Sequence, residues 1–160
     1  MHLFCLKQSD NIVFFIALLA VVVSLSAEFV IGVKPCQLCL ISRYLFAFNV
    51  CIVAFCRYFT RFRVAIIFSV IALFLFSFYH LGVENHWWEG PAGCVARLQT
   101  LENINESIID NSSVPSCDKV NLKLFGISST LWSFLLAGFI FWLTSISFIV
   151  RFYIRRYNDE

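Results

Sequence analysis

Two cysteines at redox spacing open an apolar run in the stretch KPCQLCLISRY, residues 34–44. Cys36 and Cys39 form a CxxC motif, in which a thiolate attacks or leaves a disulfide. Cys39 is expected to begin a helix, where free backbone N–H groups favour an anion. Arg43 follows four residues later, which puts it on the same helix face as Cys39. Both effects lower the pKa of a thiol, so the stretch predicts a redox-active pair beside a charge-stabilising arginine.

Metal binding is the competing interpretation of the CxxC motif. Four-ligand zinc sites usually combine two closely spaced pairs of ligands. The other candidate ligands, Cys94 and Cys117, lie 23 positions apart and supply no second short spacing. The sequence therefore favours thiol chemistry, and no metal is expected.

The composition is that of a membrane protein. Of the 160 residues, 60% are hydrophobic and only 14% are charged, which is more apolar surface than a soluble core of this size can bury. The net charge is +2 and the basic residues form no stripe, so no nucleic-acid partner is expected. Residues 1–160 are predicted to form a single integral membrane domain.

Four apolar runs of about 18 to 24 residues are long enough to cross a hydrocarbon layer of about 30 Å. The predicted fold is therefore all-α, a four-transmembrane-helix bundle with a long extracytoplasmic loop, residues 82–126, between the third and fourth helices. A cleaved signal peptide is the alternative for the first run, but that run exceeds the usual length of about 7–15 residues. The expected helices cover residues 12–33, 38–56, 64–81 and 127–150.

The short loops predict the orientation in the membrane. Three arginines and no acid fill the turn between the second and third runs, and three more arginines follow the fourth run. The positive-inside rule puts these segments and both termini in the cytoplasm. The six arginines are Arg57, Arg61, Arg63, Arg151, Arg155 and Arg156.

Topology then sorts the seven cysteines. Four of them face the compartment where disulfides persist, and they come as two pairs, Cys36 with Cys39 and Cys94 with Cys117. Taken alone, the second pair could be a structural staple that stabilises the fold by roughly 3 kcal/mol. The other three cysteines are expected to pack as small hydrophobic residues. They are Cys5, Cys51 and Cys56.

Two polar residues near the mouth of the second span are candidates for binding a ligand. Arg43 could simply extend toward the lipid headgroups, although charged residues within spans are functional by default. His80 closes the third span at the same depth. It could bind a ligand headgroup or relay protons, or it could be a capping or packing residue.

The segment after the third span is expected to rest on the bilayer surface. Trp87 and Trp88 are the aromatic pair typical of a membrane interface. A turn at Gly90 and Pro91 would then leave Cys94 accessible to a partner.

The quoted residues resemble a known family. KPCQLCLISR is similar to the PCxLCxxxR signature of the disulfide bond formation protein B (DsbB) family. The segments YHLGVENHWWEGPAGC and SCDKVNLKLFGISSTLW are similar to those around that family's second cysteine pair. With four spans in the expected order, the resemblance covers nearly the whole chain.

The resemblance implies a thiol:quinone oxidoreductase of the bacterial inner membrane, with both termini cytoplasmic. In that family a DsbA-like thioredoxin-fold protein supplies the electrons and a membrane quinone, ubiquinone or menaquinone, receives them. By analogy, Cys36–Cys39 and Cys94–Cys117 are the resting disulfides. The partner attacks Cys94, the released Cys117 attacks Cys36, and Cys39 faces the quinone. Arg43 stabilises the negative charge, and His80 aligns approximately with a histidine implicated in quinone handling.

Two departures and two alternatives remain open on the sequence. The loop from Cys94 to Cys117 is somewhat short, and Tyr44 follows Arg43 where some relatives carry another cysteine. A membrane scaffold or binding protein with two structural disulfides would also explain the cysteines, but not Arg43. A vitamin K epoxide reductase-like enzyme would carry its CxxC motif late in the bundle rather than before the second span.

Overall fold

Four long helices make up most of the described part of the chain, as the sequence predicts. The computed structural model describes residues 2–59, 63–91, 94, 117 and 122–158, so most of the expected loop 82–126 lies outside the described residues. All four helices are long and apolar enough to cross a membrane. They are α1 (His2–Phe29), α2 (Gln37–Tyr58), α3 (Arg63–Glu84) and α5 (Ser129–Asn158).

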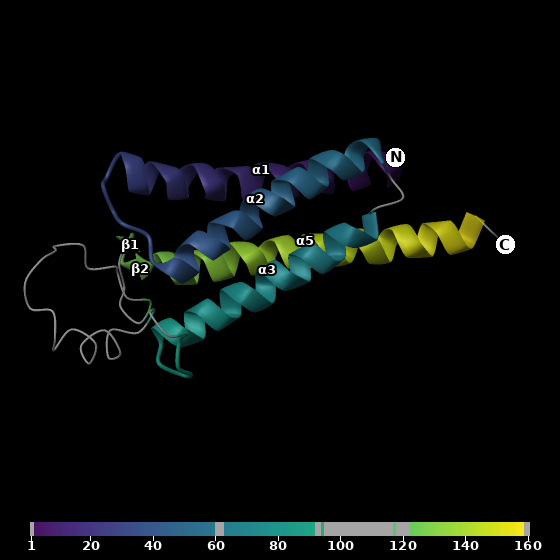
Figure 1. Ribbon diagram of the computed structural model, residues 1–160. Helices are drawn as coiled ribbons and strands as arrows, with labels where there is room; N and C mark the ends of the chain where they lie inside the picture. The colour runs from purple at the N-terminus through teal and green to yellow at the C-terminus, as the bar shows by residue number, and fades with distance from the viewer. Residues whose placement is uncertain (1, 60–62, 92–93, 95–116, 118–121, 159–160) are drawn as a thin grey trace, which may run out of the picture.

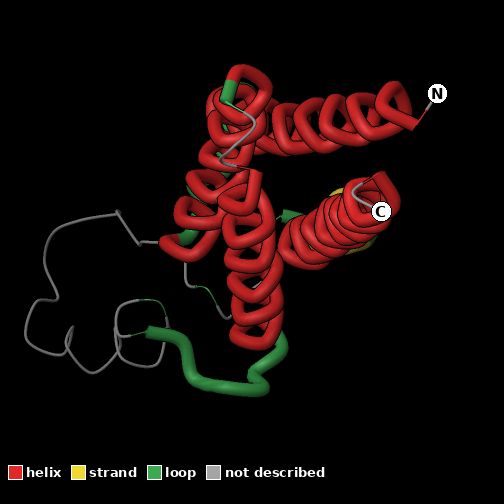
Figure 2. The backbone as a smooth tube through the Cα atoms, turned by 90° about the vertical axis from the view of Figure 1, so that its right-hand side faces the viewer, coloured by secondary structure: helices red, strands yellow, loops and turns green. Residues whose placement is uncertain are grey.

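The helices pack as a bundle in which neighbours follow the order α1, α2, α3, α5 and back to α1. Figure 1 shows both chain ends at one end of the bundle, and the connection from α1 to α2 at the other end with the only described strands. Figure 2 shows the same bundle turned by 90°. An even number of spans places both termini on one side of a membrane. The site-bearing connections therefore share the opposite side.

The helix bounds differ from the apolar runs because hydropathy marks only the lipid-facing part of a helix. In α1, helical hydrogen bonding extends through polar residues back to His2, and the helix ends at Phe29. Gly32 then adopts a positive φ of 75°, a conformation that glycine adopts without a Cβ penalty. This turn releases the chain into the extended segment that leads to Cys36.

A short β-hairpin precedes the last helix, where the sequence predicts helix from residue 127. Strand β1 (Lys123–Leu124) pairs antiparallel with β2 (Ile127–Ser128). The two-residue turn has positive φ at Phe125 and Gly126, which is typical of tight hairpins. Ser128 Oγ accepts the N–H of Leu131 at 3.2 Å, so Ser128 caps α5, as its residue type predicts.

The buried core runs along the middle of the bundle. Leu73 of α3 and Ile140 of α5 are both fully buried in it. Asn49 of α2 is also fully buried, and Ser69 Oγ of α3 donates to its Oδ1 at 2.8 Å. This contact satisfies a polar side chain inside the bundle, where no water reaches it.

Toward the end of the bundle that holds the chain termini, polar contacts join α1 to α5. Arg151 forms an ion pair with Asp10 at 2.9 Å, and Ser147 Oγ donates to Ser9 Oγ at 2.8 Å. These contacts fix the first and last helices together far from Cys36. At the Cys36 end the same two helices border a cavity, described below.

Candidate active site

The CxxC pair lies at the start of α2. Cys36 is the N-cap of the helix, and its sulfur accepts the backbone N–H of Cys39 at 3.3 Å. The two sulfur atoms are 2.7 Å apart, and no S–S bond joins them in this structure. The sulfurs are close enough for that bond to form without backbone movement.

The sequence expectation that Cys39 begins the helix is wrong. The helix begins at Gln37, and Cys36 receives the free N–H of the first turn. The reason is that the N-cap residue precedes the first helical residue and offers its side chain back to the third position, which is Cys39. The anion-stabilising effect of the helix start therefore acts on Cys36.

Cys36 lies just before the membrane-spanning part of α2, which begins at Gln37. Its hydrogen bond with the Cys39 thiol, together with His80 and the Cys39 backbone N–H, lowers the pKa of the Cys36 thiol well below the usual range. Burial opposes this shift but does not outweigh it. The helix start therefore favours the thiolate on Cys36 in the reduced pair.

His80 of α3 contacts both cysteines. Its Nε2 atom lies 3.7 Å from Cys36 Sγ and 3.8 Å from Cys39 Sγ, and its side chain is buried. The ring can donate to a thiolate or accept from a thiol, depending on its tautomer. The imidazole is therefore positioned to exchange a proton with the pair.

The three donor atoms of Cys36, Cys39 and His80 lie within 4.8 Å of one another and could hold a metal ion. Sequence reasoning considered only cysteines as ligands and did not find His80 as a third donor. Only the fold brings these three residues together, because His80 lies 41 positions after Cys39 in the sequence.

Arg43 is held by α1 rather than by the lipid headgroups. Its Nε atom donates to Ser24 Oγ at 3.0 Å, NH2 donates to the Ser24 carbonyl at 3.4 Å, and NH1 forms an ion pair with Glu28. The Arg43 side chain is only 11% exposed. Glu28 and Ser24 are residues that sequence reasoning missed, because only the packing of α1 on α2 reveals their partner.

The second pair, Cys94 and Cys117, is joined by a disulfide. The expectation that Cys94 is accessible is wrong for this structure, since Cys94 is 1% and Cys117 is 2% exposed. The disulfide packs in one buried cluster with Cys36, Leu38 and Val83.

The segment before Cys94 is fixed on α3 by Trp88. Its indole stacks on Tyr79, with ring centroids 6.0 Å apart, and its Nε1 donates to the Tyr79 carbonyl at 2.9 Å. Gly82 makes this approach feasible, because a Cβ there would lie 2.0 Å from the Trp88 ring. Trp87 stays exposed, as expected of a residue at a membrane interface.

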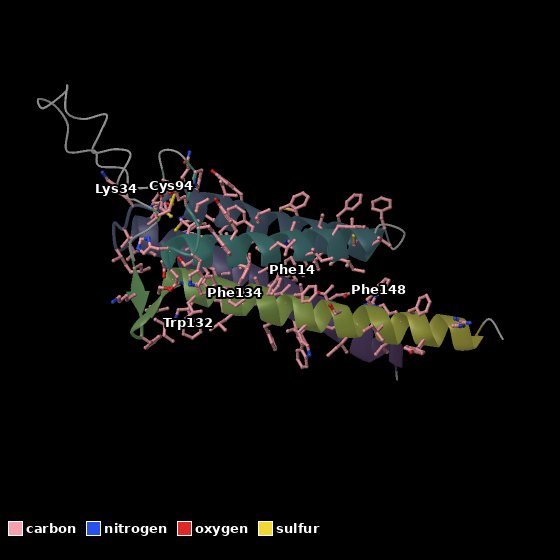
Figure 3. All side chains as sticks on the ribbon, turned by 90° about the horizontal axis from the view of Figure 1, so that it is seen from below. Phe14, Lys34, Cys94, Trp132, Phe134 and Phe148 are labelled. Carbon is pink, nitrogen blue, oxygen red and sulfur yellow. A yellow bond between two sulfur atoms is a disulfide. The ribbon has the colours of Figure 1, made fainter. Side chains whose placement is uncertain are left out.

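A cavity of about 370 Å³ lies beside the CxxC pair, between α1, α2 and α5. Cys39, Arg43 and His80 line it, whereas Cys36 packs against the second disulfide. Most of the remaining lining residues are apolar, and they come from α1, the connection from α1 to α2, α2, the hairpin region and α5. Figure 3 shows Lys34, which also lines the cavity, at the same end of the bundle as Cys94, with Phe148 toward the other end.

The size and lining of the cavity fit the ring of a lipid-soluble carrier. Ligand pockets of about 300–1,000 Å³ with apolar walls and a few polar groups are typical of small-molecule sites. Here Cys39, Arg43 and His80 supply polar groups, and apolar residues make up the larger share of the lining. A quinone has the matching shape, with polar carbonyls on an apolar ring.

Fold and site together define a multi-pass membrane protein whose two cysteine pairs meet in one buried cluster. The family model for the disulfide bond formation protein DsbB matches residues 9–147 of the 160. The chain therefore belongs to the DsbB family. Membership implies a thiol oxidase that generates disulfides, and the family uses quinone as electron acceptor. No curated protein and no solved structure matches the chain significantly.

Proposed function

We propose that this protein reoxidises a DsbA-like thioredoxin-fold dithiol in the bacterial periplasm and passes two electrons to a membrane quinone. It would act in the inner membrane, with both termini in the cytoplasm and the cysteine pairs outside. The arginine-rich connection between α2 and α3 supports this orientation.

One observation carries the proposal: the CxxC pair adjoins both the second cysteine pair and the cavity. Cys36 belongs to the buried cluster that contains the Cys94–Cys117 disulfide. Cys39, three residues later, faces the cavity. Two purely structural disulfides would need neither this contact nor a cavity beside one of their sulfurs.

The proposed reaction starts with both pairs as disulfides. A partner thiolate attacks Cys94, and the second partner thiol then closes the partner's disulfide and leaves Cys94 and Cys117 as thiols. Cys117 attacks Cys36, and Cys94 resolves that mixed disulfide, so that Cys36 and Cys39 become the reduced pair. Two electrons and two protons have then moved from the partner to the CxxC pair.

The last step returns Cys36 and Cys39 to the disulfide. A quinone, when bound, supplies a two-electron, two-proton acceptor next to Cys39. The Cys36 thiolate would form the S–S bond with Cys39 as the electron pair passes to that acceptor. His80, within 3.8 Å of both sulfurs, accepts and passes on the Cys39 thiol proton, and the second proton, lost when Cys36 ionised, is taken from solvent. Arg43 keeps a positive charge at the cavity wall, where negative charge develops.

The burial of Cys94 and Cys117 means that the reaction requires an opening of the structure. Cys94 must become exposed before a partner can attack it, because it is 1% exposed in this structure. Release of the Trp88 contact with α3 would free the segment that leads to Cys94. Partner docking is proposed to include this opening.

The test is quinone reduction by the purified full-length protein, supplied with a reduced thioredoxin-fold dithiol and ubiquinone-1. Cys39→Ser and Cys94→Ser should each abolish turnover. Cys51→Ser is the matched control, because Cys51 is exposed on α2 away from both pairs and should retain full activity. No turnover by the wild type, with the Cys94–Cys117 disulfide intact, would leave a scaffold or binding protein with structural disulfides.

A further inference from the structure

Ser42 lines the cavity with a hydroxyl that has no hydrogen-bond partner. The residue lies on α2, three positions after Cys39 and therefore on the same helix face. It is 5% exposed, and within the described part of the chain its Oγ atom contacts no donor or acceptor. A buried hydroxyl without a partner is costly, and such a group is rare unless a ligand or water satisfies it.

Four other hydroxyls in these helices satisfy themselves locally. Each of them donates to the backbone carbonyl one turn earlier, which is the usual arrangement for serine and threonine within a helix. Ser42 makes no such bond to Leu38, although the same carbonyl position is available in its helix. The locally bonded residues are Ser26, Ser133, Thr144 and Ser147.

Arg43, the next residue along α2, already has hydrogen-bond partners. Arg43 directs hydrogen bonds from three of its nitrogens to Ser24 and Glu28 on α1. Ser42 is thus the cavity-lining hydroxyl left unpaired on the turn that follows Cys39. A ligand with a hydrogen-bond acceptor, placed against Cys39, would satisfy it.

We propose that the Ser42 hydroxyl donates a hydrogen bond to a carbonyl oxygen of the quinone bound in this cavity and so strengthens quinone binding. This inference rests on the proposed function and adds a binding residue to it. The hydrogen bond orients the ring so that its other face or edge can meet Cys39 one helical turn away. A lipid ester carbonyl offers the same acceptor chemistry, and the test separates the two sources.

The chain supplies a matched control in Ser77 of α3. Its hydroxyl is also buried and also lacks a partner among the described residues, but Ser77 does not line the cavity. Ser42→Ala and Ser77→Ala therefore remove the same group from equally buried sites. Ser42→Thr keeps the hydroxyl and serves as the rescue variant.

The measurement is the Kd of ubiquinone-1 for the oxidised full-length protein in detergent, followed by quenching of tryptophan fluorescence. Trp132 lines the cavity and acts as a reporter. Ser42→Ala should raise the Kd by about tenfold, as expected for the loss of one buried hydrogen bond. Ser77→Ala should leave the Kd within twofold of wild type, and Ser42→Thr should stay near wild type.

Several results would overturn the inference. Equal Kd values for Ser42→Ala and wild type would mean that the hydroxyl does not contact the quinone. A lower Kd in Ser42→Ala would assign the hydroxyl to a competing lipid carbonyl. If the wild type fails to reduce quinone, the proposed function fails as well; if it turns over but Ser42→Ala binds normally, only this inference fails.

Discussion

At the scale of single residues, the chemistry depends on which sulfur carries the negative charge. The CxxC spacing predicts a reactive pair, but spacing does not say which sulfur the helix start favours. The N-cap position of Cys36 decides this, because its sulfur accepts the N–H of Cys39. Cys36 is thus the more acidic thiol of the reduced pair.

The first prediction concerns this thiolate. A group with a lowered pKa is charged above that pKa and loses its charge as the pH falls through it. The reduced protein should therefore keep one thiolate, absorbing near 240 nm, at pH 7, and lose it only on further acidification. In reduced Cys36→Ser this signal should be absent at pH 7. A wild-type signal that appears only above about pH 8.5, as for a free thiol, would contradict the assignment.

The second prediction concerns Arg43. Arg43→Ala should raise the KM for quinone by about tenfold or more, because the positive charge at the cavity wall is lost. Arg43→Lys should rescue only in part, since a lysine cannot reach Ser24 and Glu28 together as the planar guanidinium does. Steady-state quinone kinetics check this. An unchanged KM in Arg43→Ala would make the arginine a structural tie between α1 and α2.

At the scale of elements, apolar runs of membrane-spanning length predict the four helices because each run must satisfy its backbone hydrogen bonds internally. The hairpin at 123–128 could not be predicted, since its strands have two residues each and their pattern merges with the apolar run of α5. The pairing of Glu28 with Arg43 was also out of reach. This contact depends on the rotation of α1 about its own axis relative to α2. Because α1 is apolar around most of its circumference, its sequence does not predict that rotation.

The third prediction tests how α3 holds the segment before Cys94. Gly82→Ala places a Cβ 2.0 Å from the Trp88 ring, so the indole must leave its stack on Tyr79. We expect a loss of about 1–3 kcal/mol in stability, measured by thermal unfolding in detergent. Gly138→Ala is the control, because its Cβ would meet Phe74 at an ordinary 3.6 Å.

The same substitution has a functional consequence. Displacing Trp88 should loosen the segment and expose the second pair, so the Cys94–Cys117 disulfide of Gly82→Ala should react faster with a small dithiol than the wild-type disulfide does. Equal stability and equal reaction rates for Gly82→Ala and Gly138→Ala would contradict the role given to Trp88.

At the scale of the whole molecule, the two ends of the bundle are built differently. The Arg151–Asp10 ion pair ties α1 to α5 at the end that holds the chain termini, whereas the same helices border the cavity at the other. Sequence reasoning named all four cysteines of the proposed relay, together with Arg43 and His80, and the fold brings Cys39, Arg43 and His80 to one cavity. It did not find Ser42, because an unpaired hydroxyl is visible only once the cavity is known.

The fourth prediction concerns topology. After reduction, a non-permeant maleimide added to intact cells should label Cys94 and Cys117, and it should leave Cys5 untouched. Because a maleimide reacts with thiols and not with a disulfide, labelling of Cys94 and Cys117 should require the reductant. Labelling of Cys5 in sealed cells would reverse the orientation.

The most direct test of the relay is a single turnover of the CxxC pair alone. A Cys94→Ser/Cys117→Ser variant is reduced, freed of reductant and mixed with ubiquinone-1, and quinol and protein thiols are counted together. The account predicts one quinol formed for each protein, with loss of the two thiols of Cys36 and Cys39 and gain of their disulfide. Thiols that persist with no quinol formed would contradict electron transfer from this pair to the quinone.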